Sequence, residues 1–89
     1  CVEAIYGHLP GFIVIAPSNA YDAKGLLKAA IRSNNPVIFL ENELDYGDKM
    51  EIPTEEYLVP IGKAKVIREG KHMTLISYSR MLKFCREAA

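Results

Sequence analysis

Two short apolar runs, separated by one amphipathic segment, constrain the fold of this chain more than any other feature. Residues 12–16 and 37–40 are continuously apolar and rich in branched or aromatic side chains, as strands buried on both faces are. The segment between them repeats apolar residues at helical spacing, namely Ala23, Leu26, Leu27, Ala30 and Ile31. A strand, a helix and a second strand with short connections predict a βαβ unit with parallel strands and a right-handed crossover, and therefore an α/β fold.

The residues that flank these runs predict where each element ends. Pro17 stops the first strand, and Ser18 or Asn19 can cap the helix that follows. Asp22 lies in the first turn, where its charge favours the positive end of the helix dipole. The helix is expected to end before Pro36. Residues 41–43 then lie at the carboxyl end of the second strand, the edge where ligands usually bind in open α/β sheets.

Outside the βαβ unit the pattern is weaker. A turn is predicted at residues 7–11, and residues 45–60 are charged, proline-bearing and without periodicity, as linkers are. Residues 62–68 alternate partly, which predicts a half-exposed strand, and residues 73–77 predict another strand after a turn at 69–71. A helix is expected from about Arg80. The second half is therefore predicted to begin a separate β-β-α arrangement.

Composition excludes several classes of protein. Eleven basic residues balance eleven acidic ones among the 89, so there is no electrostatic footprint for nucleic acid or an anionic membrane. No apolar run approaches the roughly 20 residues that a membrane helix needs. Cys1 and Cys85 match no metal or redox spacing and are interpreted as reduced thiols.

No catalytic constellation is visible in the sequence, so no catalytic or cofactor-binding residue is predicted within it. His8, in the turn-rich stretch, could be a general acid or base, but it has no identifiable partner and is interpreted as a structural or surface histidine. His72, beside a lysine, is interpreted as solvent-facing. The end of the helix offers another kind of site, because its last carbonyl groups lack partners within the helix and carry the negative end of the dipole. A hard monovalent cation could bind these oxygens, or water could satisfy them. The candidate ligands are Ala30, Ile31, Ser33 and Asn35.

Several stretches, taken in order along the chain, resemble the β subunits of pyruvate dehydrogenase E1, which are transketolase-like, thiamine-diphosphate-dependent 2-oxo acid dehydrogenases. The matching stretches are Tyr6–Gly11, Ala16–Pro17, Asp22–Arg32, Asn35–Val37, Leu40–Gly47, Pro60–Lys65 and the pair Arg68 and Gly70. The resemblance implies that residues 1–52 are the second half of a pyrimidine-binding domain. It further implies that 53–61 are a linker and that 62–89 open a transketolase C-terminal domain. The chain is then an internal piece of a longer subunit.

The resemblance also implies a function for the parent protein. E1 of this family is an α2β2 heterotetramer that uses thiamine diphosphate and Mg²⁺ to decarboxylate pyruvate and to acetylate the lipoyl group of E2. Its partners are therefore the E1 α subunit, a second β subunit and E2, in the bacterial cytoplasm or the mitochondrial matrix. The family's glutamate and histidine would lie upstream of Cys1. The 89 residues alone are expected to be inactive and, because of exposed strand edges, to self-associate.

In this family a potassium ion is held at the end of the helix that matches Asp22–Arg32, and the ligand positions match Ala30, Ile31, Ser33 and Asn35. Ser33 departs from the aspartate usual in the pyruvate enzymes. Two alternatives to the pyruvate enzyme stay open. One is the β subunit of another 2-oxo acid or acetoin dehydrogenase, and the other is a non-catalytic α/β interaction module.

Overall fold

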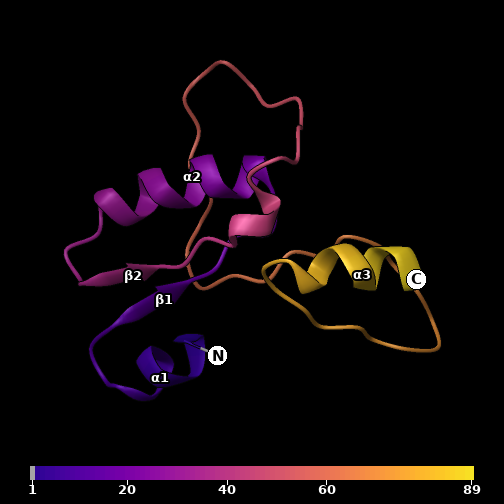
Figure 1. Ribbon diagram of the computed structural model, residues 1–89, viewed down its shortest axis with the longest axis horizontal. Helices are drawn as coiled ribbons and strands as arrows, with labels where there is room; N and C mark the ends of the chain where they lie inside the picture. The colour runs from indigo at the N-terminus through magenta and orange to yellow at the C-terminus, as the bar shows by residue number, and fades with distance from the viewer. Residues whose placement is uncertain (1) are drawn as a thin grey trace.

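A computed structural model describes residues 2–89 of the chain (Figure 1). Cys1 lies outside the described residues, so its predicted state is not tested. The elements are, in order, helix α1 (Val2–His8), strand β1 (Ile13–Ile15), helix α2 (Ala20–Ile31), strand β2 (Val37–Phe39), the 3-10 turn η1 (Glu43–Asp45) and helix α3 (Met81–Ala88). None of the described helices is long and apolar enough to cross a membrane.

The βαβ unit is confirmed. β1 and β2 pair in parallel, with Val14 opposite Ile38, and α2 connects them. Asn19 caps α2, as the sequence predicted: its backbone is extended and its side chain accepts a hydrogen bond from the Asp22 N–H. The two strands are shorter than the apolar runs that predicted them. In Figure 1 α2 covers one side of the strands and α1 lies on the other.

The predicted burial of both strands is only partly present in this chain. Among the described residues Ile15 is the one buried apolar side chain, and all three residues of β2 are half-buried. The reason is geometric, since a sheet of two strands has an open edge on each side and the extensive contacts of α1 among the described elements are with β1. Tyr6 of α1 meets Phe12 edge to face, with ring centroids 6.4 Å apart.

The predicted turn at residues 7–11 is wrong at its start. Gly7 and His8 belong to α1, a helix that the sequence analysis did not predict, and the turn covers only residues 9–11. The Leu9 N–H donates to the Tyr6 carbonyl at 3.2 Å, which closes the helix, and Gly11 then adopts a positive φ of 97°. A side chain at Gly11 would strain this backbone.

The two strands predicted in the second half are also wrong for this structure. Residues 62–68 and 73–77 have no regular secondary structure and almost all of them are exposed. A strand requires a neighbour to satisfy its backbone groups, and alternation within a segment does not supply one. The helix expected from about Arg80 is confirmed as α3.

Residues 53–59, here called the strap, pack across α2. The Tyr57 hydroxyl donates to the Tyr21 carbonyl at 3.0 Å, and the two rings stack with centroids 4.4 Å apart. The Lys24 ammonium group donates to the Pro53 carbonyl. Gly25 is buried beneath the strap, where a β-carbon would lie only 2.5 Å from the Val59 side chain. The segment predicted as a linker is therefore fixed on the helix.

Candidate functional site

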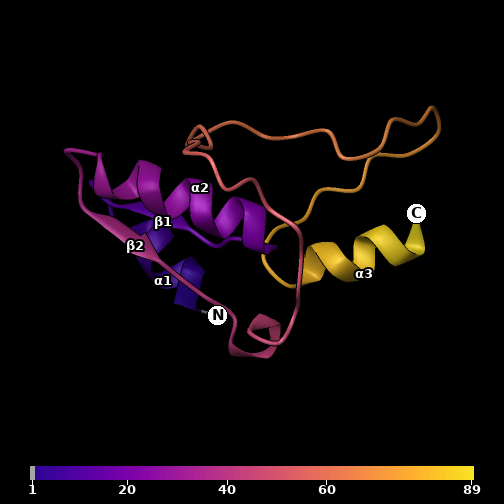
Figure 2. The ribbon, with the colours of Figure 1, turned by 90° about the horizontal axis from the view of Figure 1, so that it is seen from above.

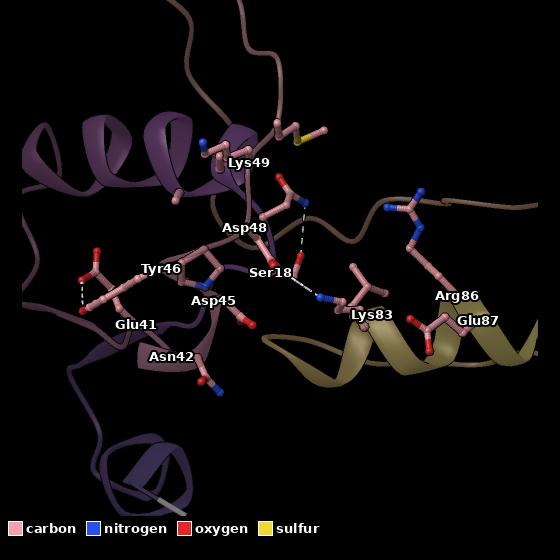
Figure 3. Close-up of a pocket in the computed structure, with 16 residues that line it drawn as sticks. Ser18, Glu41, Asn42, Asp45, Tyr46, Asp48, Lys49, Lys83, Arg86 and Glu87 are labelled. Carbon is pink, nitrogen blue, oxygen red and sulfur yellow. Dashed lines mark hydrogen bonds and ion pairs between the residues drawn. The ribbon is translucent and has the colours of Figure 1, made fainter.

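A pocket of about 740 Å³ lies where β1 and β2 end and α2 begins (Figure 3). Residues 17–20 form its floor with Ala23. One wall is formed by residues 41, 42, 45, 46 and 48–50, and α3 supplies another through residues 82, 83, 86 and 87. This is the carboxyl edge of the parallel strands, where ligands usually bind in open α/β sheets. The structure has a pocket at this edge, and the contribution of α3 to it was not foreseen.

The polar side chains at the floor of the pocket hydrogen-bond to one another. The Asn19 side-chain carbonyl accepts from the Asp22 N–H at 2.8 Å, and its NH₂ group donates to the Asp22 carboxylate at 2.6 Å. The Ser18 hydroxyl lies 3.5 Å from the same carboxylate. These bonds rigidify the start of α2.

Glu41 and Tyr46 form the second polar pair of the pocket. The Tyr46 hydroxyl donates to the Glu41 carboxylate at 2.9 Å, as the dashed line in Figure 3 shows. This hydrogen bond and the negative charge of Glu41 raise the pKa of Tyr46 above its ordinary value, so the phenol stays protonated. Glu43 starts η1 and does not line the pocket. Of the two glutamates at the strand end, only Glu41 reaches the site.

Two ion pairs connect the pocket walls. Arg80 Nη1 lies 2.7 Å from Asp45 Oδ1, and Lys83 Nζ lies 3.1 Å from Asp48 Oδ2. Sequence analysis missed all four residues, because each pair joins positions thirty-five residues apart and no local pattern indicates that they meet.

The four proposed potassium ligands lie at the opposite end of α2. Ala30 and Ile31 form its last turn, and the Ser33 N–H donates to the Ala30 carbonyl at 3.0 Å. The Ser33 hydroxyl accepts from the Asn35 N–H at 3.1 Å. The Arg32 guanidinium donates to the Lys28 carbonyl at 3.2 Å and places positive charge near this negative helix end.

Other candidate groups are dispersed. Within residues 2–89 no three histidine, cysteine, aspartate or glutamate residues are grouped as a metal site. His8 and His72 are both exposed, as expected for solvent-facing residues. Cys85 is a half-buried free thiol.

Comparison with known proteins gives a consistent assignment. Residues 1–49 match the family described as transketolase, pyrimidine binding domain. The chain is 55% identical over 93 residues to pyruvate dehydrogenase E1 component subunit beta, mitochondrial, of Homo sapiens, and 54% identical to that of Rattus norvegicus. The beta-2 subunit of Oryza sativa subsp. japonica is 50% identical over the same length.

All of the chain is aligned in these comparisons, and it spans about a quarter of the length of each relative, 26% for the human and rat proteins and 25% for the rice protein. The pyrimidine-binding match covers the βαβ unit and the wall of the pocket between β2 and Lys49. The chain belongs to the transketolase pyrimidine-binding family, and it is homologous along its whole length to the β subunit of pyruvate dehydrogenase E1.

Proposed function

We propose that the protein carrying this chain is the β subunit of a pyruvate dehydrogenase E1, which decarboxylates pyruvate and acetylates the lipoyl group of E2. The observation that carries the proposal is the alignment of all 89 residues at 50–55% identity with subunits of that name. A different 2-oxo acid or acetoin dehydrogenase is less well supported, because the relatives compared are named for pyruvate.

The proposed partners are the E1 α subunit, a second β subunit and E2. The surface of the chain supports assembly, since apolar side chains on α1 and before β1 are exposed, among them Val2, Ile5 and Phe12. Exposed apolar side chains of this kind are often covered by a partner. The relatives are named mitochondrial, and we propose the mitochondrial matrix in place of the bacterial cytoplasm.

Thiamine diphosphate and Mg²⁺ are the cofactors proposed for the whole enzyme. The donor set of the described residues does not fit the metal, because no three carboxylate, histidine or cysteine side chains are grouped. In the pocket, Lys83 is already paired with Asp48. No residue of this chain is therefore assigned to either cofactor, and no step of the reaction is routed through the pocket.

We also propose the domain division 1–52, 53–61 and 62–89. The match to the pyrimidine-binding family ends at residue 49, close to the first boundary. The strap falls within the second interval and packs on α2, so this linker holds a fixed place on the first domain.

We propose a potassium site at the end of α2, and the chemistry of its donors supports it. Ala30, Ile31, Ser33 and Asn35 lie in the last turn of α2 or just after it, and their carbonyl and hydroxyl oxygens are hard ligands near a negative helix end. The Ala30 carbonyl accepts one hydrogen bond and retains its second lone pair. The bound ion would supply positive charge to these oxygens and fix the turn between α2 and β2.

Replacing Ser33 with aspartate is expected to make the stability of the chain depend more strongly on K⁺. Without the ion, a negative charge at the end of α2 opposes the helix dipole and lowers the free energy of unfolding by about 0.3–1 kcal/mol. A K⁺ concentration about five times the Kd returns about 1 kcal/mol. Thermal unfolding in K⁺ and in tetramethylammonium salts measures both effects.

Asn34→Asp is the matched control, because it adds the same charge one residue further along, on an exposed residue that is not a proposed ligand. It should show the dipole effect without a gain in the K⁺ response. Equal K⁺ responses from both variants would exclude a specific ion site at Ser33.

The proposed function is tested with a hybrid subunit. These 89 residues replace the aligned stretch of the Homo sapiens β subunit, and the hybrid is produced together with the human α subunit. We expect an assembled enzyme that retains most of the parent's pyruvate-dependent CO₂ release and acetylation of lipoyl domain. A hybrid carrying the aligned Oryza sativa stretch, which is similarly divergent, is the control.

The outcomes separate the alternatives. An assembled but inactive hybrid, beside an active rice hybrid, contradicts the proposed function. Failure of this hybrid alone to assemble with the α subunit favours the interaction-module alternative. Faster turnover of a branched 2-oxo acid or acetoin than of pyruvate favours the related dehydrogenases.

A further inference from the structure

The guanidinium group of Arg32 joins the end of α2 to the strap. Its Nη1 donates to the Lys28 carbonyl at 3.2 Å, and its Nη2 donates to a carboxylate oxygen of Glu56. Lys28 carries the first of the last four carbonyl groups of α2, and Ala30 and Ile31 carry two of the others. A carboxylate of the strap therefore pairs with a cation at the helix end that holds the proposed potassium ligands.

The neighbours of Glu56 hold the strap on α2. The Tyr57 hydroxyl donates to the Tyr21 carbonyl at 3.0 Å, and the two rings stack. Lys24 Nζ donates to the Pro53 carbonyl at 2.5 Å, and Figure 2 shows the strap beside α2. The ion pair itself is more than half exposed on both sides, so it contributes little to this attachment. The other contacts bring the carboxylate to the helix end.

The charge of Arg32 bears directly on the binding of a cation at this helix end. A guanidinium group and a potassium ion both place positive charge at the negative end of α2, and like charges repel each other. The Glu56 carboxylate offsets the guanidinium charge, because the two groups form an ion pair. With the strap docked, the ligand oxygens therefore lie near a neutral pair instead of an isolated cation.

We propose that docking of the strap brings Glu56 to Arg32 and thereby raises the affinity of the helix end for a monovalent cation. The inference rests on the potassium site proposed above and adds its regulation by the segment that leads to the next domain. Linkage makes the effect reciprocal, so a bound ion favours the docked strap by the same factor. Occupancy of the site and attachment of the linker are then coupled.

The test uses the hybrid enzyme described above, in which these residues belong to a full-length β subunit assembled with the α subunit. Amide hydrogen exchange is measured across a range of K⁺ concentrations at constant low ionic strength, with tetramethylammonium as the replacing cation. Exchange at residues 30–35, the turn that carries the proposed ligands, gives the Kd for K⁺. Exchange at residues 54–59 reports the docking of the strap in the same experiment.

Two single substitutions change the charge at the site in opposite directions. Glu56→Gln leaves Arg32 as an uncompensated cation and is expected to raise the Kd for K⁺ about two- to threefold, the effect of one unit charge near a surface. Arg32→Gln leaves the carboxylate alone and is expected to lower the Kd by a similar factor. The double variant removes both charges and should return the Kd close to that of the parent hybrid.

Glu55→Gln is the matched control for Glu56→Gln. It removes the same charge from the neighbouring residue of the strap, whose side chain takes part in none of the ion pairs within residues 2–89. Its Kd for K⁺ should stay close to that of the parent hybrid. K⁺ should also slow exchange in the strap of the parent hybrid two- to threefold more than in that of Glu56→Gln, because the coupling is reciprocal.

Opposite shifts in the two single variants, with a return in the double variant, support the coupling. The coupling is overturned, while the site stands, if the parent hybrid responds to K⁺ and all the charge variants have the same Kd. Weaker binding in both single variants also overturns it, because the strap would then act by holding structure and not by charge. A turn that does not respond to K⁺ in the parent hybrid contradicts the potassium site, and the coupling falls with it. Pyruvate-dependent activity is measured separately and reports the proposed enzyme function alone.

Discussion

Replacing Gly25 with valine is expected to lower the free energy of unfolding by about 2–3 kcal/mol. The strap passes so close to α2 that a β-carbon at this position lies 2.5 Å from Val59 Cγ2, 2.9 Å from Tyr57 Cε2 and 3.0 Å from the Val59 backbone nitrogen. The backbone contact cannot be relieved by a rotamer change. The strap must therefore move away, which disrupts the stack of Tyr21 on Tyr57.

Urea unfolding of the chain, followed by far-ultraviolet circular dichroism, measures the loss, and the near-ultraviolet tyrosine signal reports the displaced stack. Gly7→Val is the matched control, since Gly7 also lies in a helix, but a β-carbon at Gly7 would meet no atom within 4 Å. Its effect should stay within about 0.5 kcal/mol. Similar losses at the two glycines would show that helix propensity, and not the strap, determines the result.

The βαβ unit could be predicted because its signals are local. Proline, asparagine and the apolar spacing of residues 20–31 each act within one or two helical turns, and the structure confirms the helix, its cap and the parallel strands. The strap could not be predicted in this way. In the sequence Gly25 is only a glycine inside a predicted helix, where glycine lowers helix stability. The close approach of Val59, thirty-four residues later, explains why a glycine lies there.

Strand prediction failed in the second half for a related physical reason. Residues 62–68 and 73–77 have strand-like patterns, but a strand exists only when its backbone groups are paired, and residues 2–89 offer them no partner. An alternating pattern indicates which face of a segment would be buried, but it does not identify the element that would cover that face. Val66 and Ile76, which the pattern would pack, are 74% and 91% exposed.

In the candidate site, too, the local features could be predicted and the long-range contacts could not. Its place at the carboxyl edge follows from parallel topology, which the sequence predicted. The wall contributed by α3 depends on Asp45–Arg80 and Asp48–Lys83, contacts across thirty-five residues that no local rule selects. The potassium ligands were named from the unpaired carbonyl groups at the helix end and again through the resemblance, and their role stays a prediction.

The second large effect is expected at the floor of the pocket, where Asn19→Ala should lower the free energy of unfolding by about 1–2 kcal/mol. The side chain of Asn19 accepts the Asp22 N–H at 2.8 Å and donates to the Asp22 carboxylate at 2.6 Å. Alanine leaves the N–H without its cap and removes a bond to a charged group. Urea unfolding measures the total, and amide hydrogen exchange at residues 20–23 shows whether α2 frays from its first turn.

Asn19→Ser separates the two contributions, because a hydroxyl oxygen can still accept the Asp22 N–H but cannot replace both bonds of the amide. The free energy of unfolding of Asn19→Ser should lie between that of the unmutated chain and that of Asn19→Ala. Asn34→Ala, at an exposed asparagine in the turn beyond α2, should change stability by less than about 0.5 kcal/mol. If Asn19→Ala matched that value and left exchange at residues 20–23 unchanged, the start of α2 would be held by its packing on the strands and the strap, and the pocket floor would not depend on the cap.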